Sequence, residues 1–431
     1  KSINALPTLC FERAYKKAKQ LMQKKIDDRG LLSGMPVTIK DLNDVSGVRC
    51  TSGSPIFKDR VAEKSDILVE NIEEKGGIVY AMSNTPEFGA GANTFNEVFG
   101  QTLNPWNIRK SVAGSSGGAA AALATGMAWL AHGSDFGGSL RNPASFCSVV
   151  GMRPSPGRVA SNPSGILSQT LGVNGPMARN VLDLALFFDA MIGEKTKDPI
   201  SIPIPNRSFL SYAQERKKPV KVAISQDLGL PPVDPVIREK ILKIGKILEK
   251  QGIIVEEANP NLSQAPFVSR TLRAFSFYVN LKSQYIKNKD KLKPEIIWNI
   301  DEGKALTIDD LEKAQNGRVD LYNEMQNFFD GYDLLLCPST IMPPFPVEER
   351  YPKSCDGVEF SNYIEWLNIV SAVTLTGSPA LSLPCGFTPN GLPIGLQIIS
   401  KFKSEANLLS NAAFIEANIG FKNPIPINPF I

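Results

Sequence analysis

The chain has 431 residues, of which 42% are hydrophobic and 21% are charged. This composition is ordinary for a globular protein with a large buried core, and the length suits one large α/β domain or two to three average ones. The formal net charge of +4 is small and spread along the chain, which argues against nucleic acid or an anionic membrane as a partner.

Cysteine and histidine usage limits the metal and redox chemistry. The six cysteines are scattered without a Cys-x-x-Cys pair, and His132 is the single histidine. We therefore expect free thiols in a cytoplasmic location, no metal site and no cofactor. The apolar run Ala119–Ala131 is too short to span a bilayer. Because the chain begins at Lys1 rather than at a methionine, the sequence leaves open whether an N-terminal segment is missing.

Helix and strand signals alternate through the first part of the chain. The predicted elements are an amphipathic helix at Phe11–Lys25, a short strand at Val37–Ile39, a helix capped by Ser65 or Asp66, a strand at Ile78–Met82, and a buried helix over the alanine-rich run Ala119–Ala131. This βα rhythm favours an α/β sheet.

The same rhythm returns in the second half. The predicted elements are a strand at 219–225, a helix starting at Asp234-Pro235 and ending before Gly252, a strand at 253–257, a helical region at 260–330, a strand at Tyr332–Thr340, and a hairpin at Ser378–Ser400 turning at Asn390-Gly391. No Pro- or Ser-rich linker and no clear repeat interrupts the chain. We therefore predict one large domain over residues 1–431.

The stretch "GSDFGGSLRNP" (Gly133–Pro143) carries the first chemical signal. Glycines before a serine let backbone N–H groups converge near the serine oxygen, where they can stabilise the oxyanion of acyl transfer. Most Gly-Gly-Ser triplets are only tight turns, so Gly137-Gly138-Ser139 alone is weak evidence. A nucleophilic Ser139 also needs a base, and the usual base, histidine, occurs only at His132.

Two further segments contain residues that could take a proton from Ser139. "AGSSGGAAAALATG" places Ser115 and Ser116 before an alanine-rich helix, and it fits neither the G-x-x-x-x-G-K-[ST] nor the G-x-G-x-x-G phosphate pattern. Lys40 follows an apolar strand. A lysine there is usually exposed, but a buried one has a lowered pKa and can act as a base.

Together these segments resemble the amidase signature family of serine hydrolases. The resemblance rests on "GMPVTIKD" around Lys40, "NPWN…AGSSGGAAAALATG" around Ser115 and "GSDFGGSLRNPASFCSVVGMRPSPGRV" around Ser139. It continues through "GVNGPMARNV", "YDLLLCPST" and "GSPALSLPCGF…NGLPIGLQII", and so covers about residues 5–420. It implies a central twisted mixed β-sheet covered by helices on both faces, with core motifs at 34–200 and 330–400.

The resemblance implies a Ser–cis-Ser–Lys triad in place of histidine. Ser139 would be the nucleophile, and Lys40, neutral at rest, would draw its proton through the Ser115 hydroxyl. The Gly114–Ser115 peptide would be cis. The backbone N–H groups of Phe136, Gly137, Gly138 and Ser139 would form the oxyanion hole.

Neighbouring residues receive supporting roles. Ser116 is expected to hydrogen-bond behind the triad, Asp135 and Arg141 to form a structural ion pair, and His132 to be a core residue. The walls of the substrate pocket are expected near Gly89–Gly91, Pro163–Val173 and the helical region at 265–365, with a variable segment at about 260–330. Gly89 is the residue expected to leave room for a substrate.

Three functions remain open. The leading hypothesis is a stand-alone amidase acting on small or aryl/alkyl carboxamides, with a small-molecule amide as its partner and a homodimer possible. The alternative is the glutaminase component of a glutamyl-tRNA amidotransferase complex, although "RPSPGRVASNPSG" departs from the "PTYGRVSRYG" style associated with that component. The third is a non-catalytic binding protein, which the presence of all three triad residues disfavours.

Overall fold

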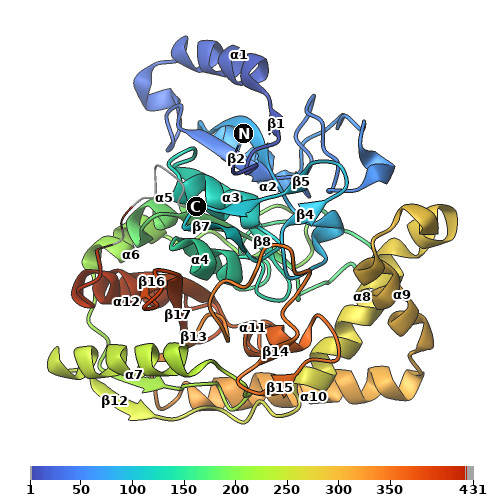
Figure 1. The fold of residues 1–431 in the computed structure, drawn as a ribbon. Coiled ribbons are helices and arrows are strands. Elements are labelled where there is room, and N and C mark those ends of the chain that lie inside the picture. Colours follow the sequence, from blue (N-terminus) through green and yellow to red (C-terminus); the bar gives the residue numbers. More distant parts are fainter. Residues whose placement is uncertain (1, 423, 425–431) are drawn as a thin grey trace.

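The computed structural model describes residues 2–422 and residue 424. These residues form a mixed sheet of 11 strands in the order β1-β3-β2-β8-β10-β9-β16-β17-β13-β11-β12 (Figure 1). In that order the strands are Thr8–Leu9, Ile78–Ser83, Pro36–Lys40, Leu130–Asp135, Val173–Ala178, Val150–Arg153, Ala380–Phe387, Pro393–Ile399, Leu334–Pro338, Lys221–Ile224 and Ile254–Glu257. Three small two-stranded sheets are β4 (Phe95–Asn96) with β5 (Gly100–Gln101), β6 (Leu103–Asn104) with β7 (Asn107–Ser111), and β14 (Ser354–Cys355) with β15 (Val358–Glu359).

Helices join and cover these strands. The α-helices of the described chain are α1 Phe11–Met22, α2 Ile67–Glu74, α3 Gly117–Ala124, α4 Arg141–Cys147, α5 Val181–Met191, α6 Phe209–Glu215, α7 Pro235–Lys250, α8 Ala265–Asn288, α9 Pro294–Ala305, α10 Ile308–Phe328, α11 Asn368–Leu375 and α12 Glu405–Asn418. Helix α8 contacts α9, α10 and α11, and Figure 1 shows α8 to α10 (yellow to orange) together on one side of the molecule.

Two hydrophobic clusters show that helices cover both faces of the sheet. Ala131 of β8 and Met177 of β10 are paired neighbours and belong to the cluster that includes α3. Leu130 and Ala178, the adjacent pair, belong to the cluster that includes α5. Because successive side chains of a strand point to opposite faces, the two clusters lie on opposite sides of the sheet at β8 and β10. The predicted fold class is confirmed.

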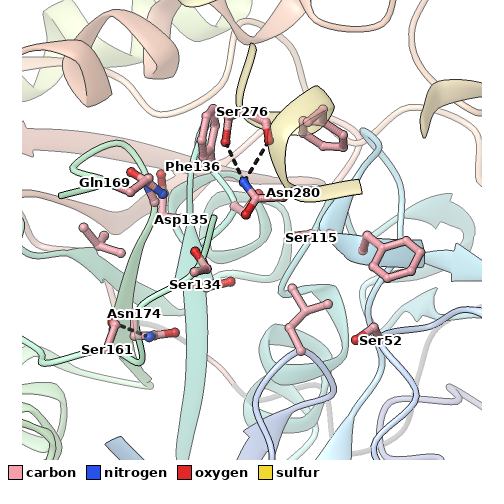
Figure 2. Close-up of a pocket in the computed structure, with 18 of the residues that line it drawn as sticks. Ser52, Ser115, Ser134, Asp135, Phe136, Ser161, Gln169, Asn174, Ser276 and Asn280 are labelled. Atoms are coloured by element: carbon pink, nitrogen blue, oxygen red, sulfur yellow. Dashed lines mark hydrogen bonds between the residues drawn. The ribbon is translucent and has the colours of Figure 1, made fainter. Parts of the chain in front are cut away.

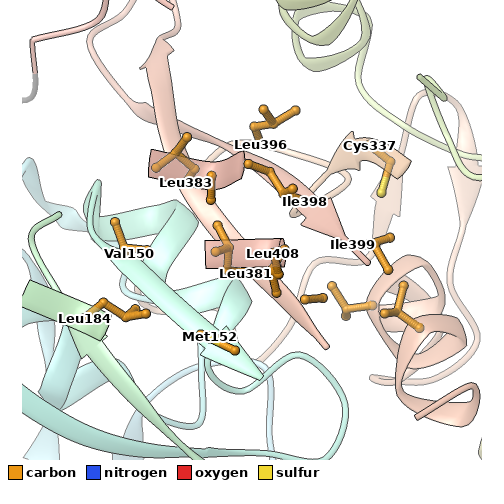
Figure 3. Packing of buried hydrophobic residues seen from close by; sticks show 14 of the residues in the cluster. Val150, Met152, Leu184, Cys337, Leu381, Leu383, Leu396, Ile398, Ile399 and Leu408 are labelled. Atoms are coloured by element: carbon orange, nitrogen blue, oxygen red, sulfur yellow. The ribbon is translucent and has the colours of Figure 1, made fainter. Parts of the chain in front are cut away.

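The larger cluster includes the middle strands of the sheet. Figure 3 shows Leu408 of α12 beside Leu381 of β16, and Leu184 of α5 beside Val150 and Met152 of β9. β16 and β17 form the antiparallel hairpin predicted from the sequence, with its turn at Asn390-Gly391. This rigid centre supports the strands beside it that carry the polar residues described below.

Most predicted elements are present, but the helix at Ala119–Ala131 is wrong. Helix α3 ends at Ala124, Gly126 adopts a φ of +72°, and the chain re-enters the sheet as β8 at Leu130. The run is therefore six residues of a buried helix, a turn in which Met127 and Trp129 are exposed, and the first two residues of a buried strand. At the N-terminus, α1 ends at Met22 rather than Lys25.

The six cysteines are all free thiols, five of them buried and Cys10 partly buried. Burial raises the pKa of each thiol, for example to about 12 at Cys337 and Cys385. They therefore stay protonated at neutral pH.

Candidate active site

The residues singled out in the sequence converge at one edge of the sheet. Strands β2 and β8 are parallel neighbours, so their carboxyl ends meet at the same edge. Lys40 is the last residue of β2, and Ser134 precedes the last residue of β8. Ser115 lies just before α3, and Ser139 lies in the turn between β8 and α4.

The Lys40 amine is surrounded by serine hydroxyls. Its Nζ lies 2.6 Å from Ser115 Oγ, 2.9 Å from Ser116 Oγ and 3.0 Å from Ser134 Oγ. The Gly114–Ser115 peptide is cis, as the resemblance implies. The backbone N–H of Ser116 donates to the Ser139 carbonyl at 3.1 Å, which ties the paired serines to the turn that holds Ser139.

The hydrogens in this group can be assigned by counting donors. The Ser116 hydroxyl donates to the Ser134 carbonyl at 3.2 Å, so its oxygen can only accept from Lys40. As an ammonium, Lys40 can donate to all three hydroxyls. In the neutral form of Lys40 one N–H goes to Ser116, and the nitrogen lone pair can accept from the Ser115 or the Ser134 hydroxyl, of which Ser115 is the nearer.

Lys40 is placed to be a base. Burial lowers the pKa of Lys40 to about 7, against the charge of Asp135, which raises it. The side chain is 0% exposed and does not line the cavity, whereas Ser115 and Ser134 both do. A proton moving between the cavity and Lys40 must therefore pass through one of those hydroxyls.

His132 supports Lys40 from behind and does not titrate with it. The Lys40 backbone N–H donates to His132 Nδ1 at 3.2 Å, so the ring hydrogen lies on Nε2, 3.0 Å from Asn174 Oδ1. Burial lowers the pKa of His132 to about 3. The ring is therefore neutral and acts as a structural residue, as predicted.

The turn before Ser139 is held by a buried ion pair. Asp135 and Arg141 are 3.0 Å apart with both side chains 0% exposed, and Arg153 adds a second cation at 3.4 Å. Burial alone would raise the pKa of the Asp135 carboxyl, but the two arginines outweigh it and hold that pKa well below its usual range. The predicted structural ion pair is confirmed.

The oxyanion hole differs from the prediction at Gly138. The Gly138 N–H donates to Asp135 Oδ1 at 3.0 Å, so this donor belongs to the turn and is not free for a substrate. Within the described chain, the N–H groups of Phe136, Gly137 and Ser139 have no acceptor. Three of the four backbone donors that the resemblance implies are therefore without an acceptor in the described chain.

A cavity of about 480 Å³ opens over these groups (Figure 2). The three predicted wall regions all contribute to it. The lining includes Phe88 and Gly89, the loop residues Ser164, Gln169, Gly172 and Val173, and the α8 residues Arg273, Ser276, Phe277, Asn280 and Leu281. A Cβ on Gly89 would lie 3.4 Å from Ser115 Oγ and 3.1 Å from Leu42 Cδ1, so glycine keeps the approach to Ser115 open.

Two residues of the site, Ser134 and Arg273, were not predicted from the sequence. Ser134 was quoted within its motif but not recognised as a third hydroxyl on Lys40, although it is one of the β8 residues that end at the same edge as β2. Arg273 gave no signal at all, because a charged residue on a long amphipathic helix is typically solvent-exposed. Only the tertiary fold places it in the cavity wall.

The family model described as Amidase matches residues 1–409. The chain belongs to the amidase signature family of hydrolases. An acylamidase from Rhodococcus erythropolis is 33% identical over 425 residues, covering 96% of this chain and 88% of that protein. A glutamyl-tRNA(Gln) amidotransferase component from Sulfurihydrogenibium is also 33% identical, over 95% of this chain and 88% of that protein.

Solved structures agree with this assignment. A bacterial aryl acylamidase superposes with a TM-score of 0.91 and 25% identity, covering 100% of this chain and 92% of the other. A 6-aminohexanoate cyclic dimer hydrolase follows at 0.89 and 25%, covering 99% and 92%. The same amidotransferase component from Thermotoga maritima reaches 0.75 at 25%, covering 97% and 95%.

Two further kinds of feature are absent from the described residues. None of their helices is both long and apolar enough to cross a membrane. No cluster of three or more histidine, cysteine, aspartate or glutamate side chains in that part of the chain could hold a metal ion.

Proposed function

We propose that this chain hydrolyses a carboxylic acid amide to the acid and ammonia or an amine, through an acyl-enzyme on Ser139. The observation that carries the proposal is the 2.6 Å contact between Ser115 Oγ and a buried lysine whose pKa is lowered to about 7. A neutral amine, a hydroxyl relay and a serine in the same cavity supply the base, the path and the nucleophile of acyl transfer.

In the first half-reaction, Ser139 Oγ attacks the amide carbonyl while its proton passes through the Ser115 hydroxyl to Lys40. The oxyanion that forms is stabilised by the N–H groups of Phe136, Gly137 and Ser139, each such donor being worth about 3 kcal/mol in the barrier. The C–N bond then breaks, and Lys40 returns the proton through Ser115 to the leaving nitrogen. The products of this step are the amine and the Ser139 ester.

In the second half-reaction, water attacks the ester along the same path. Lys40 takes a proton from the water through Ser115, the C–O bond to Ser139 breaks, and the proton returns to the serine oxygen. The acid leaves, and every group regains its starting protonation.

The second candidate is the glutaminase component of an amidotransferase, which the 33% identity to the Sulfurihydrogenibium protein favours. The comparison of folds favours the stand-alone amidase, since the TM-score is 0.91 with the aryl acylamidase and 0.75 with the Thermotoga maritima amidotransferase component. We therefore place the stand-alone enzyme first.

The test measures ammonia and amine release by the purified chain alone, on glutamine, asparagine, short aliphatic amides, benzamides and an anilide. The Ser139→Ala variant is the blank, and Ser263→Ala, which removes an exposed hydroxyl outside the cavity, is the matched control. Turnover of an aliphatic or aryl amide that Ser263→Ala keeps and Ser139→Ala loses supports the proposal. Activity confined to glutamine favours the amidotransferase component, and unchanged turnover in Ser139→Ala refutes the mechanism.

A further inference from the structure

The wall of the cavity opposite the catalytic hydroxyls contains a buried cation without a counter-ion. Arg273, on α8, lines the cavity and is 7% exposed. No carboxylate of the described chain forms an ion pair with it. The other charged residue of the lining, Asp135, is already paired with Arg141 and Arg153. The free charge of the cavity is therefore positive.

Two neutral contacts and an aromatic shell fix the direction of the guanidinium. Nε donates to Asn299 Oδ1 at 3.2 Å, and Nη2 donates to the Tyr363 hydroxyl at 2.8 Å. The rings of Phe277 and Phe136 lie 4.8 Å and 5.6 Å from the guanidinium carbon. The group is thus held rigidly by partners that leave its charge uncompensated.

One of the remaining donors lies beside the turn that holds Ser139. Of the five N–H groups of an arginine, two are used by these contacts, and Nη1 has no hydrogen-bond partner among the described residues. Nη1 lies 3.8 Å from where a Cβ on Gly137 would be. Nη1 is not among the fully buried side-chain atoms that lack a partner, so it is open to the cavity, where an anionic group of a ligand can accept from it.

We propose that Arg273 binds a carboxylate on the substrate, so that this enzyme acts on amides carrying a second, anionic group a short way from the scissile carbonyl. A guanidinium presents parallel N–H groups that match the two oxygens of a carboxylate. The apolar side chains of Leu42, Phe88 and Leu281 in the same lining suit the short aliphatic spacer between the two groups. This inference rests on the proposed amide hydrolysis, and it names the substrate class.

The test compares succinamate with butyramide, which has a methyl group in place of the carboxylate, and repeats the comparison one carbon longer with glutaramate and valeramide. We expect the wild-type enzyme to prefer the charged member of at least one pair. Arg273→Gln should reduce that preference by about 10- to 100-fold, the value of a charged hydrogen-bonded contact. Arg273→Lys keeps the charge but not the paired donors. Its preference for the charged amide should therefore lie between that of the wild type and that of Arg273→Gln.

Arg270→Gln is the matched control. Arg270 lies one turn earlier on α8, with an exposed side chain paired to Glu302 outside the cavity. This variant should leave the preference unchanged. A wild-type enzyme without preference in either pair, or an equal loss on both members in Arg273→Gln, would overturn the inference while leaving amide hydrolysis intact.

A binding measurement tests the role of Arg273 even if none of these amides is hydrolysed. Calorimetry with Ser139→Ala should show succinamate or glutaramate binding more tightly than its uncharged partner. Adding Arg273→Gln, or Arg273→Lys if the first double variant does not fold, should abolish or weaken that difference. Equal affinity for the charged and uncharged ligands in Ser139→Ala would refute the role of Arg273, whatever the fate of the hydrolytic mechanism.

Discussion

Lys40 Nζ lies 2.6 Å from Ser115 Oγ beneath a cavity that Ser115 lines and Lys40 does not. In the proposed reaction the substrate therefore meets a hydroxyl, while Lys40, the group that changes protonation, lies behind that hydroxyl. Because the two groups are separate, the protonation of Lys40 can be tested by pH dependence, and the hydroxyl that relays the proton can be tested by substitution.

The pH dependence of the reaction should report Lys40. Because the lysine acts as a base and its pKa is lowered to about 7, kcat/KM for an uncharged amide should fall about tenfold per pH unit below that value and level off above it. His132 cannot supply this inflection, since its pKa is lowered to about 3. Lys40→Ala should lower kcat by about 10²- to 10⁴-fold. Residual activity that keeps an inflection near neutral pH in Lys40→Ala would contradict the assignment.

Ser115 and Ser134 both touch Lys40 and both line the cavity, and their distances predict unequal roles. Ser115→Ala should reduce kcat far more than Ser134→Ala, because Ser115 makes the 2.6 Å contact and Ser134 the 3.0 Å one. Single-turnover measurement of amine release separates this effect from substrate binding. Equal losses in the two variants would mean that the proton has two routes.

Gly89→Ala should damage the site more than the fold. Its φ of +71° makes any side chain cost about 1–2 kcal/mol, and the new methyl group would lie 3.4 Å from Ser115 Oγ. Gly391→Ala is the matched control, since Gly391 has a φ of +76° with nothing within 4 Å. Both variants should lose similar stability in denaturant unfolding, but only Gly89→Ala should lose activity. Full activity in Gly89→Ala would show that substrate does not pass this residue.

Asp135→Asn should destabilise the whole protein. It leaves Arg141 and Arg153 buried without their counter-ion, a change that typically costs about 3–5 kcal/mol. The exposed pair of Lys401 and Asp330 provides the comparison, because Asp330→Asn should cost about 1 kcal/mol or less. Thermal unfolding of the two variants measures the difference. Similar melting temperatures would imply that the turn before Ser139 relaxes around the missing charge.

Local patterns were sufficient for much of the fold. The helix that starts at Asp234 and stops before Gly252 was predicted because its cap, its apolar spacing and its terminating glycine are neighbours in sequence. The hairpin of β16 and β17 was predicted for the same reason. The prediction for the alanine-rich run failed because apolar Met127 and Trp129 lie in an exposed turn, so the run read as one apolar helix, and the break at Gly126 was not weighed.

In the site, too, residues that lie in sequence motifs were predicted, whereas features that depend on tertiary contacts were not. Lys40, Ser115 and Ser139 were found because each lies in a recognisable motif, and the fold brings the first two into contact. The commitment of the Gly138 N–H to Asp135 depends on how the turn closes, which no spacing reveals. Arg273 becomes a cavity residue only when α8 packs beside Phe136, a residue far earlier in the chain.

The buried thiols have a practical consequence for labelling chemistry. All six cysteines are protonated at neutral pH, and five are shielded from solvent. An electrophilic reagent offered to the folded enzyme therefore meets no ready thiolate. A covalent adduct formed under native conditions is therefore expected on an oxygen or nitrogen nucleophile, and the partly buried Cys10 is the one thiol to exclude by peptide mapping of the labelled protein.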